Sequence, residues 1–586
     1  MSVSGQNHSR IAEILRVGLL LLLLTLIGFA VCTPWFGLVG DDWWFFAHLS
    51  DGQFPSALLY ENPQRPPVPY MWMGLWQLFG LRIWAYYLFD FSVQWIAAVA
   101  VFAIFRDILR WRLLDSVTVA AIFLLYPSDT AHLYLPVLSG RVCMMLVAVA
   151  AYLWLRAWTS SVRPVPLIVA SLVLMGLALF SYETGVVMLA LLPLLLARIA
   201  WRGFRAWLAH AVPCGSLLLV YLAFRLWIDR AAAQRADAFY VSLKLTPAWL
   251  RAQIQALPAA TTWNGWLYAL KAMLNLGLVE SAVALILLMA LLLLALKWLL
   301  RPATAASRNW RGNLALIGVG FALSAVAVAP IIVSSFALQN VVGTLDGRFV
   351  LGAALGHGVL ITGICALPGS ILPLSGKGRA MLREMLIVLL LAVALLGGLG
   401  VQKQYARAWR TQLDTVRALQ NYSPTFDDDT VILLLDVPTG PFDVRFYYPF
   451  TQLVRRFYAN PTLHVLPWQQ GFAPADQLLA LGEKHIVAVT DVVRKDTLRF
   501  DYDHVIAFRV EPDGGLQPVQ VIDSRYLCGD TCGDLSFALP EGWMPAHDPV
   551  NLDYTLRSTA AGGSAYLDWR AFLRSQLDFV GAVELP

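Results

Sequence analysis

Long apolar runs alternate with short polar connections over about the first 400 residues. An apolar run of about 20 residues is long enough to cross a bilayer as a helix. Windows of that length predict about eleven transmembrane helices. They are expected at 17–37, 82–105, 116–135, 139–158, 166–180, 184–200, 207–228, 281–300, 313–338, 349–368 and 385–401. The pattern therefore predicts a polytopic α-helical membrane protein.

Basic residues gather in every second connection, which predicts the orientation of the helices. They are Arg10 and Arg16, then Arg106, Arg110 and Arg112, then Arg156 and Arg163, then Arg198, Arg202 and Arg205, then Lys297, Arg301, Arg308 and Arg311, then Lys377, Arg379 and Arg383. Cytoplasmic connections carry an excess of Lys and Arg. We therefore expect a cytoplasmic N-terminus in a bacterial inner or plasma membrane. An odd number of spans would put the C-terminal region outside.

The composition agrees with a membrane protein. The 586 residues are 58% hydrophobic and only 14% charged, with a mean hydropathy of +0.63. A soluble protein of this length rarely has so little charge. The net charge of +5 does not indicate nucleic-acid binding, because the arginines lie between apolar runs, where they act as topology signals.

Polar residues return after residue 401, so we divide the chain into a transmembrane domain at 1–401 and an extracytoplasmic domain at 402–586. Strands are expected at 430–435, 463–466 and 485–490, with helices at 445–458 and 474–481. This βαβαβ order predicts a small α/β domain with a parallel sheet. A hairpin-like pair is expected at 504–510 and 519–522. We expect this domain to act as a lid or to recognise the acceptor.

The six cysteines form two groups. Four are scattered through apolar runs and are expected to be buried thiols: Cys32, Cys143, Cys214 and Cys365. Cys528 and Cys532 lie close together in the C-terminal region. In an oxidising compartment their spacing favours a short-loop disulfide over free thiols, whereas zinc would need two further ligands that are not found nearby.

Adjacent carboxylates follow the first apolar run at Asp41 and Asp42. Desolvated like charges repel, so such a pair at a membrane exit suggests that something uses its charge. A hydrated interfacial turn is the alternative. Arg141 and Arg348 stand at other outer connections and could bind a phosphate, or could simply reach the lipid headgroups.

Three further polar residues lie in the outer connections. Arg65 lies in the first, in Arg65-Pro66-Pro67. Glu183 follows the fifth run and could serve an active site or cap the next helix. His132 is more often a satisfied polar residue than a ligand.

The order of these residues resembles the membrane glycosyltransferases of fold class C (GT-C), in particular the protein O-mannosyltransferases and the transmembrane, tetratricopeptide-repeat-bearing O-mannosyltransferases. The resemblance covers residues 41 to about 193 and the neighbourhood of Arg348. It rests on Asp41-Asp42, Gln64-Arg65-Pro66-Pro67, His132 with Val137-Leu138-Ser139-Gly140-Arg141, Ser181-Tyr182-Glu183-Thr184-Gly185, and Gly347-Arg348-Phe349-Val350-Leu351. Val142-Cys143 and Tyr182 depart from the family, which has a small-acidic pair and a lysine there. The tetratricopeptide repeats are absent.

The resemblance implies a GT-C-like, inverting glycosyltransferase that uses a polyprenyl-phosphate-linked sugar. Asp41 or Asp42 would deprotonate the acceptor, a protein, lipid or glycan on the external face. Arg141 and Arg348 would bind the donor phosphate, with Glu183, His132 and Arg65 in positioning roles. A divalent metal is left open as a cofactor, held by the Asp pair if by anything. The rival readings are a lipid-linked-sugar flippase and a non-catalytic membrane assembly protein.

Overall fold

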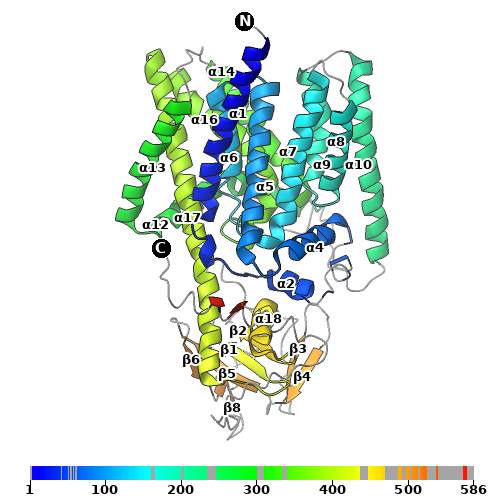
Figure 1. Ribbon diagram of the computed structural model, residues 1–586, viewed down its shortest axis with the longest axis vertical. Coiled ribbons are helices and arrows are strands. Elements are labelled where there is room, and N and C mark those ends of the chain that lie inside the picture. The colour runs from blue at the N-terminus through cyan, green and yellow to red at the C-terminus, as the bar shows by residue number, and fades with distance from the viewer. Residues whose placement is uncertain are drawn as a thin grey trace. The chain divides into compact units, whose positions relative to one another are not determined.

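The structure of the protein is a computed structural model (Figure 1). It describes residues 3–40, 42–50, 52, 56, 58–59, 63–159, 165–199, 203–233, 246–299, 309–332, 338, 341–435, 447–468, 486–490, 497–501, 505–511, 515–519, 521–523, 536–538, 572–573 and 575–576. Helices dominate the first three quarters of the chain, and the described strands all follow Thr430.

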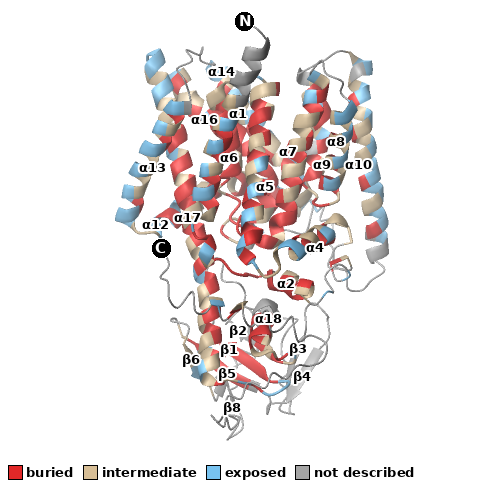
Figure 2. Cartoon of the chain, in the orientation of Figure 1, coloured by how far each residue is buried: buried red, intermediate tan, exposed pale blue. Residues whose placement is uncertain are grey.

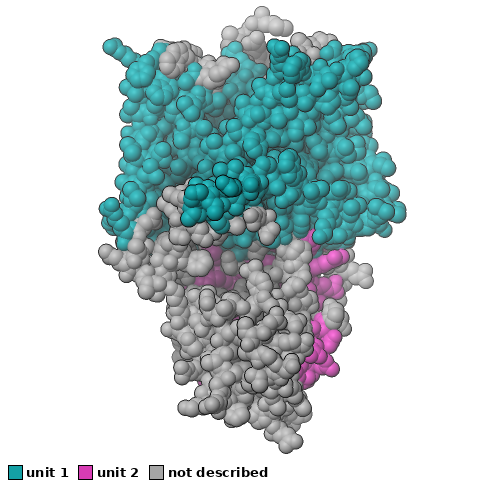
Figure 3. Space-filling model, turned by 180° about the vertical axis from the view of Figure 1, so that it is seen from behind, with its two compact units in different colours: residues 1–34, 58–72, 84–403 teal, residues 35–57, 73–83, 404–586 magenta. Residues whose placement is uncertain are grey.

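The chain divides into two compact units (Figure 3). Unit 1 comprises Met1–Pro34, Leu58–Trp72 and Trp84–Lys403. Unit 2 comprises Trp35–Ala57, Met73–Ile83 and Gln404–Pro586. Unit 2 thus includes two segments of the first outer connection, which a single division after residue 401 does not predict.

Unit 1 is built from helices. Those that lie wholly within it are α1 (Val3–Thr25), α6 (Leu113–Leu124), α7 (Leu138–Thr159), α8 (Val165–Leu179), α9 (Gly185–Ile199), α10 (Phe204–Ala233), α11 (Pro247–Pro258), α12 (Asn264–Leu274), α13 (Leu278–Leu299), α14 (Trp310–Ala327), α15 (Ala329–Ile332) and α16 (Ala354–Ile371). Residues of both units contribute to α4 (Pro67–Phe79), α5 (Ile83–Ala103) and α17 (Gly376–Tyr422). Leu26–Ala30, Ile104–Ile108 and Ala259–Trp263 are π-helical turns, and Thr33–Trp35, Leu135–Val137 and Leu345–Ala353 are 3-10 helices.

Eight helical segments among the described residues are long and apolar enough to cross a membrane. They are Ala12–Trp35, Ile83–Ile108, Leu135–Thr159, Trp207–Ile228, Leu278–Trp298, Trp310–Ala327, Asp346–Ile371 and Gly376–Tyr422. Leu113–Leu124, Val165–Leu179 and Gly185–Ala197 are shorter apolar helices. The structure confirms a mostly helical, polytopic membrane protein. The count of about eleven spans stays a prediction.

Burial separates the inner helices of unit 1 from the outer ones (Figure 2). Within an apolar window of 18 residues in each of the spans Leu135–Thr159 and Asp346–Ile371, 67% and 72% of the positions are buried. In Trp207–Ile228 and Leu278–Trp298 the shares are 17% and 11%. The outer helices nevertheless have apolar surfaces, as expected for side chains that face lipid.

Two predicted spans end earlier than expected. The run at 116–135 is helical only to Leu124. In the run at 313–338, α14 ends at Ala327 and the short α15 follows at Ala329–Ile332. Pro127 follows the first helix end closely, and proline cannot donate the backbone hydrogen bond that a continuing helix needs. The apolar composition continues beyond Leu124, but the backbone turns there, and this connection carries Asp129 and His132.

The last predicted span is longer than expected. Residues 385–401 lie inside α17, which extends over 47 residues to Tyr422. Charged residues such as Arg410 and Asp414 make i,i+4 pairs along its later part. Trp409, Leu413 and Val416 are buried along one face of this part, while the other face is charged, so the mean hydropathy of the segment does not reveal it.

Unit 2 contains a four-stranded sheet in the order β2-β1-β5-β6. Its strands are β1 (Val431–Leu435), β2 (His464–Trp468), β5 (Val505–Val510) and β6 (Leu516–Pro518). β1 pairs in parallel with β2 and β5, and β6 is antiparallel to β5. All five residues of β1 are buried, which suits the centre of a parallel sheet. Helix α18 (Tyr447–Tyr458) connects β1 to β2.

The third predicted strand of the parallel sheet has a different partner. Residues 486–490 form β3, which pairs antiparallel with β4 (Thr497–Asp501) in a separate two-stranded sheet. β5 takes the place beside β1 instead. A second two-stranded sheet among the described residues joins β7 (Val521–Asp523) to β8 (Ser536–Ala538). Strand propensity identifies a strand but not its neighbour.

Several predictions concern positions outside the described residues. They are Asp41, Cys528, Cys532 and the helix at 474–481. Of the other cysteines, Cys32, Cys143, Cys214 and Cys365 are buried free thiols, as predicted.

Candidate functional site

Two arginines converge on one carboxylate in unit 1. Arg65 contacts Glu183 through Nη2–Oε2 at 2.8 Å and Nε–Oε1 at 3.4 Å. Arg225 donates from Nη1 to Glu183 Oε1 at 3.0 Å. The three side chains are 27%, 25% and 23% exposed for Arg65, Glu183 and Arg225. We call these three residues the Glu183 cluster.

Local structure places each member of the cluster. Arg65 immediately precedes the Pro66-Pro67 step into α4, and its carbonyl accepts a hydrogen bond from the amide of Val68. Proline at the start of a helix fixes the backbone there. Glu183 lies in the turn between α8 and α9. Near the end of α10, Arg225 directly follows Phe224, whose ring packs on Phe180 with centroids 5.1 Å apart.

Tyr182 joins further predicted residues to the cluster. The guanidinium carbon of Arg65 lies 4.4 Å from the centroid of its ring, as a cation–π contact does. A Cβ on Gly140 would stand 3.6 Å from that ring, so the Gly140-Arg141 turn packs against it. Burial raises the pKa of Tyr182, while the charges of Arg65 and Arg348 act in the opposite direction. Arg348 is therefore close enough to act on the same group.

Arg348 is held by a close backbone approach. A Cβ on the preceding Gly347 would lie 2.9 Å from the amide nitrogen of Thr130, which only glycine avoids. The hydroxyl of Thr130 also donates to the carbonyl of Thr344 at 2.9 Å. The guanidinium of Arg348 lies 3.7 Å from Asp346 and is 26% exposed.

The charges of the Glu183 cluster favour its ionised form. Burial alone would raise the pKa of Glu183, but Arg65 and Arg225 together hold it below its usual range. Burial would lower the pKa of Arg65, but Glu183 and two tyrosines raise it. Two positive charges meet one negative charge, so the cluster carries an excess positive charge on a partly exposed surface.

Arg141 has a different environment. Its Nη1 lies 2.6 Å from Asp90 Oδ2, and the two side chains are 1% and 0% exposed. A second guanidinium nitrogen donates to the carbonyl of Ala131. Asp90 also accepts from Gln94 at 3.1 Å. The structure thus places Arg141 in a buried ion pair, whereas a role as a phosphate ligand stays a prediction.

Asp129 and His132 lie in the buried connection after α6. The carbonyl of Asp129 is 2.8 Å from His132 Nδ1, and the imidazole packs on Phe29 with centroids 4.9 Å apart. Burial raises the pKa of Asp129 to about 6 against the opposing charge of Arg141. Burial also lowers the pKa of His132 to about 4, so this imidazole is neutral at pH 7. A cavity of about 30 Å³, enough for one water molecule, adjoins both residues.

Asp42 belongs to unit 2, where it begins α2 (Asp42–Ser50). Its Oδ2 accepts a hydrogen bond from the amide of Val39 at 2.7 Å. The following Trp43 donates from Nε1 to Gln412 Oε1 at 3.0 Å, and Gln412 donates to the carbonyl of Leu38. The chain around Asp42 is therefore held by a side-chain network within unit 2.

The two departures from the family pattern contact each other. Cys143 Sγ lies 3.5 Å from the carbonyl of Tyr182 and 3.8 Å from the hydroxyl of Thr184. A Cβ atom added to Gly185 would lie 3.4 Å from the Sγ atom of Cys143. A small, buried thiol suits this close packing better than a charged side chain would.

Two residues of these contacts escaped the sequence-based prediction. Arg225 was counted within the apolar run 207–228, and Asp90 within 82–105. A charged residue inside a membrane span is expensive and usually has a partner. That signal alone would have identified both residues. In the structure the partner of Arg225 is Glu183, and the partner of Asp90 is Arg141.

The described residues do not fit a metal site. No three His, Cys, Asp or Glu side chains among them converge as metal ligands do. Asp42 directs one oxygen to a backbone amide, and Asp41 lies outside the described range. No chemical step is therefore assigned to a metal.

No family model matches this chain, and no curated protein matches it. The solved structures that resemble it include two of ArnT from Cupriavidus metallidurans. The apo structure has a TM-score of 0.37 at 13% identity, and the structure bound to undecaprenyl phosphate has 0.33 at 14%. Each match covers 73% of this chain and 84% of ArnT. Scores this low do not establish a shared fold, so function is inferred from this chain's own residues.

Proposed function

We propose that this chain is an integral-membrane glycosyltransferase that moves a sugar from a polyprenyl-phosphate donor to an acceptor on the external face. The Glu183 cluster carries this proposal. It presents two guanidinium groups on a partly exposed surface beside membrane-spanning helices. Guanidinium groups suit phosphate because their planar fork donates two parallel hydrogen bonds.

The cluster retains donors for a ligand. Arg65 directs Nε and Nη2 to Glu183, and Arg225 directs Nη1 to it. A guanidinium has five N–H bonds, so each arginine keeps others for a second anion. Glu183 would orient the two arginines. The donor phosphate would bind the N–H groups of the arginines that do not contact Glu183. Arg348, whose charge also acts on Tyr182, would add to the positive potential.

The reaction needs a base and a stabilised leaving group. The acceptor oxygen forms a bond to the anomeric carbon while the bond from that carbon to the phosphate oxygen breaks. The acceptor proton goes to a carboxylate, assigned by resemblance to Asp41 or Asp42. Polyprenyl phosphate leaves with the bonding electrons, and the arginines stabilise its charge. Attack from the face opposite the phosphate inverts the anomeric centre.

The proposal is tested by transfer from labelled polyprenyl-phosphate sugars in membrane fractions. Asp42→Asn keeps an oxygen acceptor for the Val39 amide but cannot serve as a base. Loss of a general base lowers a rate by about 10²- to 10⁴-fold. We expect a decrease of this size in Asp41→Ala/Asp42→Ala, and in Asp42→Asn if Asp42 is the base.

Folding and donor binding serve as controls for these variants. Donor binding is expected to stay at the wild-type level, because the proposed phosphate ligands lie in unit 1. Asp42→Asn is expected to fold as wild type does, because it keeps the acceptor for the Val39 amide. Unchanged transfer in the double alanine variant would contradict the enzymatic role of the pair. Flipping of the donor without transfer would instead support the flippase.

A further inference from the structure

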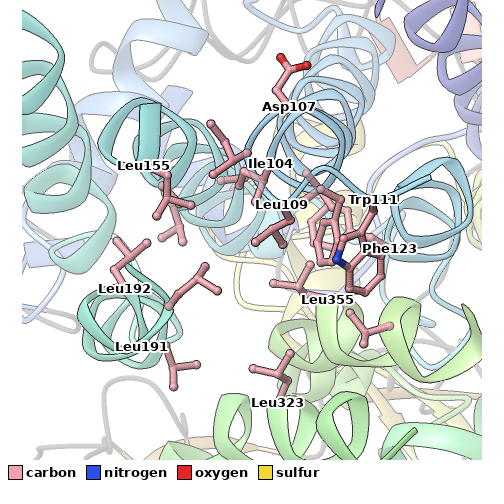
Figure 4. A pocket seen from close by; sticks show the side chains of 18 of the residues that line it. Ile104, Asp107, Leu109, Trp111, Phe123, Leu155, Leu191, Leu192, Leu323 and Leu355 are labelled. Carbon is pink, nitrogen blue, oxygen red and sulfur yellow. The ribbon is translucent and has the colours of Figure 1, made fainter. Parts of the chain in front are cut away.

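A large apolar cavity lies inside unit 1 between two sets of helices (Figure 4). Its volume is about 1180 Å³. Leu155 and Leu192, from α7 and α9, lie across it from Leu355 of α16. Protein interiors have few voids larger than a water molecule. Pockets for small ligands are about 300–1,000 Å³, so this cavity has room for an extended apolar chain.

The cavity opens at the apolar surface of the helices. Leu194 of α9 and Val319 of α14 both line it, and they are 61% and 51% exposed. Exposed leucine and valine on the apolar helices of a membrane protein face lipid tails, which are equally apolar. A lipid chain can therefore enter sideways from the bilayer.

One end of the cavity is charged. Arg110 and Arg156 line it there, together with Asp107. Both arginines are exposed, and neither makes an ion pair with any described residue. The neighbouring Arg106 is already paired with Glu13. The two unpaired arginines leave this end of the cavity with an excess of positive charge.

The conformation of Arg110 is also unusual. Its φ angle is 54°, in the left-handed region that non-glycine residues rarely adopt. Glycine or asparagine would fit this backbone conformation better, so the conformation of the turn does not explain why an arginine stands here. We therefore relate the arginine to its charged side chain, which lines the cavity.

This end of the cavity lies far from the Glu183 cluster. Arg141, whose turn packs against Tyr182, and Arg156 are at opposite ends of α7. The fifteen residues from 141 to 156 span about 22 Å at 1.5 Å per residue. That distance is most of the thickness of a bilayer's hydrocarbon core. A headgroup at Arg156 would therefore belong to the other leaflet.

We propose that the cavity binds an anionic phospholipid, with one acyl chain inside it and the phosphate of the headgroup against Arg110 and Arg156. The positive charge selects an anionic lipid over a zwitterionic one. The basic connections predict that this end faces the cytoplasmic leaflet, where such lipids are found. This site is separate from the proposed transferase site and does not depend on it.

Native mass spectrometry of the full-length protein in detergent tests the headgroup contact. Dioleoyl phosphatidylglycerol and dioleoyl phosphatidylcholine are supplied in equal amounts. Wild type is expected to retain phosphatidylglycerol preferentially. Each arginine near a membrane surface contributes about 1 kcal/mol, so Arg110→Gln/Arg156→Gln should lower the preference about 30-fold. Arg205→Gln, an exposed arginine outside the cavity, should leave it unchanged.

A cavity-filling variant tests the acyl chain. Ala151 lines the cavity, and Ala151→Trp should reduce retention of both lipids while sugar transfer continues. If this variant does not fold, the arginine variants decide the question. Equal retention of the two lipids by wild type, or an unchanged preference in Arg110→Gln/Arg156→Gln, would overturn the proposal. So would displacement of the bound lipid by polyprenyl phosphate, which would assign the cavity to the donor chain.

Discussion

The surroundings of Arg141 and those of Glu183 are inverse arrangements of the same charges. The guanidinium of Arg141 contacts Asp90 and also interacts electrostatically with Asp129, and all three residues are buried. Glu183 is a single carboxylate between Arg65 and Arg225, all about one quarter exposed. The first arrangement has excess negative charge away from solvent. The second has excess positive charge within reach of a ligand.

The contrast separates a buried ion pair from the partly exposed cluster that we propose as the phosphate site. A buried carboxylate with insufficient positive charge responds by raising its pKa, as Asp129 does. Glu183 is partly exposed between two arginines, and their positive charges lower its pKa. A second anion would be repelled from the first arrangement and attracted to the second. The motif pattern names Arg141 as a phosphate ligand and Arg65 as a positioning residue, and it does not predict that one is buried and the other partly exposed.

The largest expected effect is on the stability of the buried pair. Arg141→Met leaves Asp90 buried without its countercharge, which is destabilising by about 3–5 kcal/mol. We expect a marked decrease in the unfolding temperature of the purified protein in detergent, followed by tryptophan fluorescence.

A paired substitution provides the control. Arg141→Met/Asp90→Leu replaces both charges with apolar groups of similar size, which is often close to neutral. It should recover most of the lost stability. If the single variant were as stable as wild type, Arg141 would not be a structural residue, and its role as a phosphate ligand would gain support.

The next effect is on donor use at the Glu183 cluster. Hydrogen bonds to charged groups contribute about 1.5–3 kcal/mol, or roughly 10- to 100-fold in binding. We expect Arg65→Ala to lower kcat/KM for the donor within this range, with little change in unfolding temperature. Arg65→Lys keeps the charge but loses the fork and the flat contact with Tyr182, so most of the decrease should persist. A loss of stability as large as that of Arg141→Met would contradict the distinction between the two arrangements.

The sequence predicts helices well and the ends of helices poorly. Apolar length identified α5, α7, α10 and α16, because the bilayer sets the length of a span. It failed beyond Leu124, where apolar side chains continue while the backbone turns to contact Thr344 through Thr130. That contact joins residues more than 200 positions apart, and no local pattern contains it.

Two of the three members of the Glu183 cluster were predicted from the sequence, but Arg225 and the contacts between the members were not. Arg65 and Glu183 were identified by their motif order, yet nothing local showed that they contact each other. The sequence suggested Arg141 as a phosphate ligand, a role that stays a prediction, but the motif did not reveal that this residue is buried. The buried partner of Arg141 is Asp90, which lies 51 residues away in the sequence. In unit 2 the apolar strand at 486–490 was found correctly, but its partner was not, because neighbouring strands in a sheet need not follow each other in the chain.

The smallest expected effect is on the pH dependence of stability, where the two arrangements should have opposite signs. The pKa of Asp129 is raised to about 6 in the folded protein. As pH rises from about 4 to 6, the unfolded chain loses this proton first, so wild type loses stability over that window. Asp129→Asn does not titrate, and we expect it to gain about 1–2 kcal/mol relative to wild type between pH 4 and pH 6.

Glu183→Gln supplies the matched variant with the opposite sign. The lowered pKa of Glu183 stabilises the folded protein at neutral pH, and this contribution is lost as pH falls toward the folded pKa. Glu183→Gln should therefore be less stable than wild type near pH 7, and the difference should shrink on acidification. Unfolding temperatures of both variants and wild type from pH 3 to pH 7 measure the two slopes, because the contribution of Glu183 is lost only below its ordinary pKa of 4.5. Slopes of the same sign would mean that burial, and not the ratio of arginines to carboxylates, governs both regions.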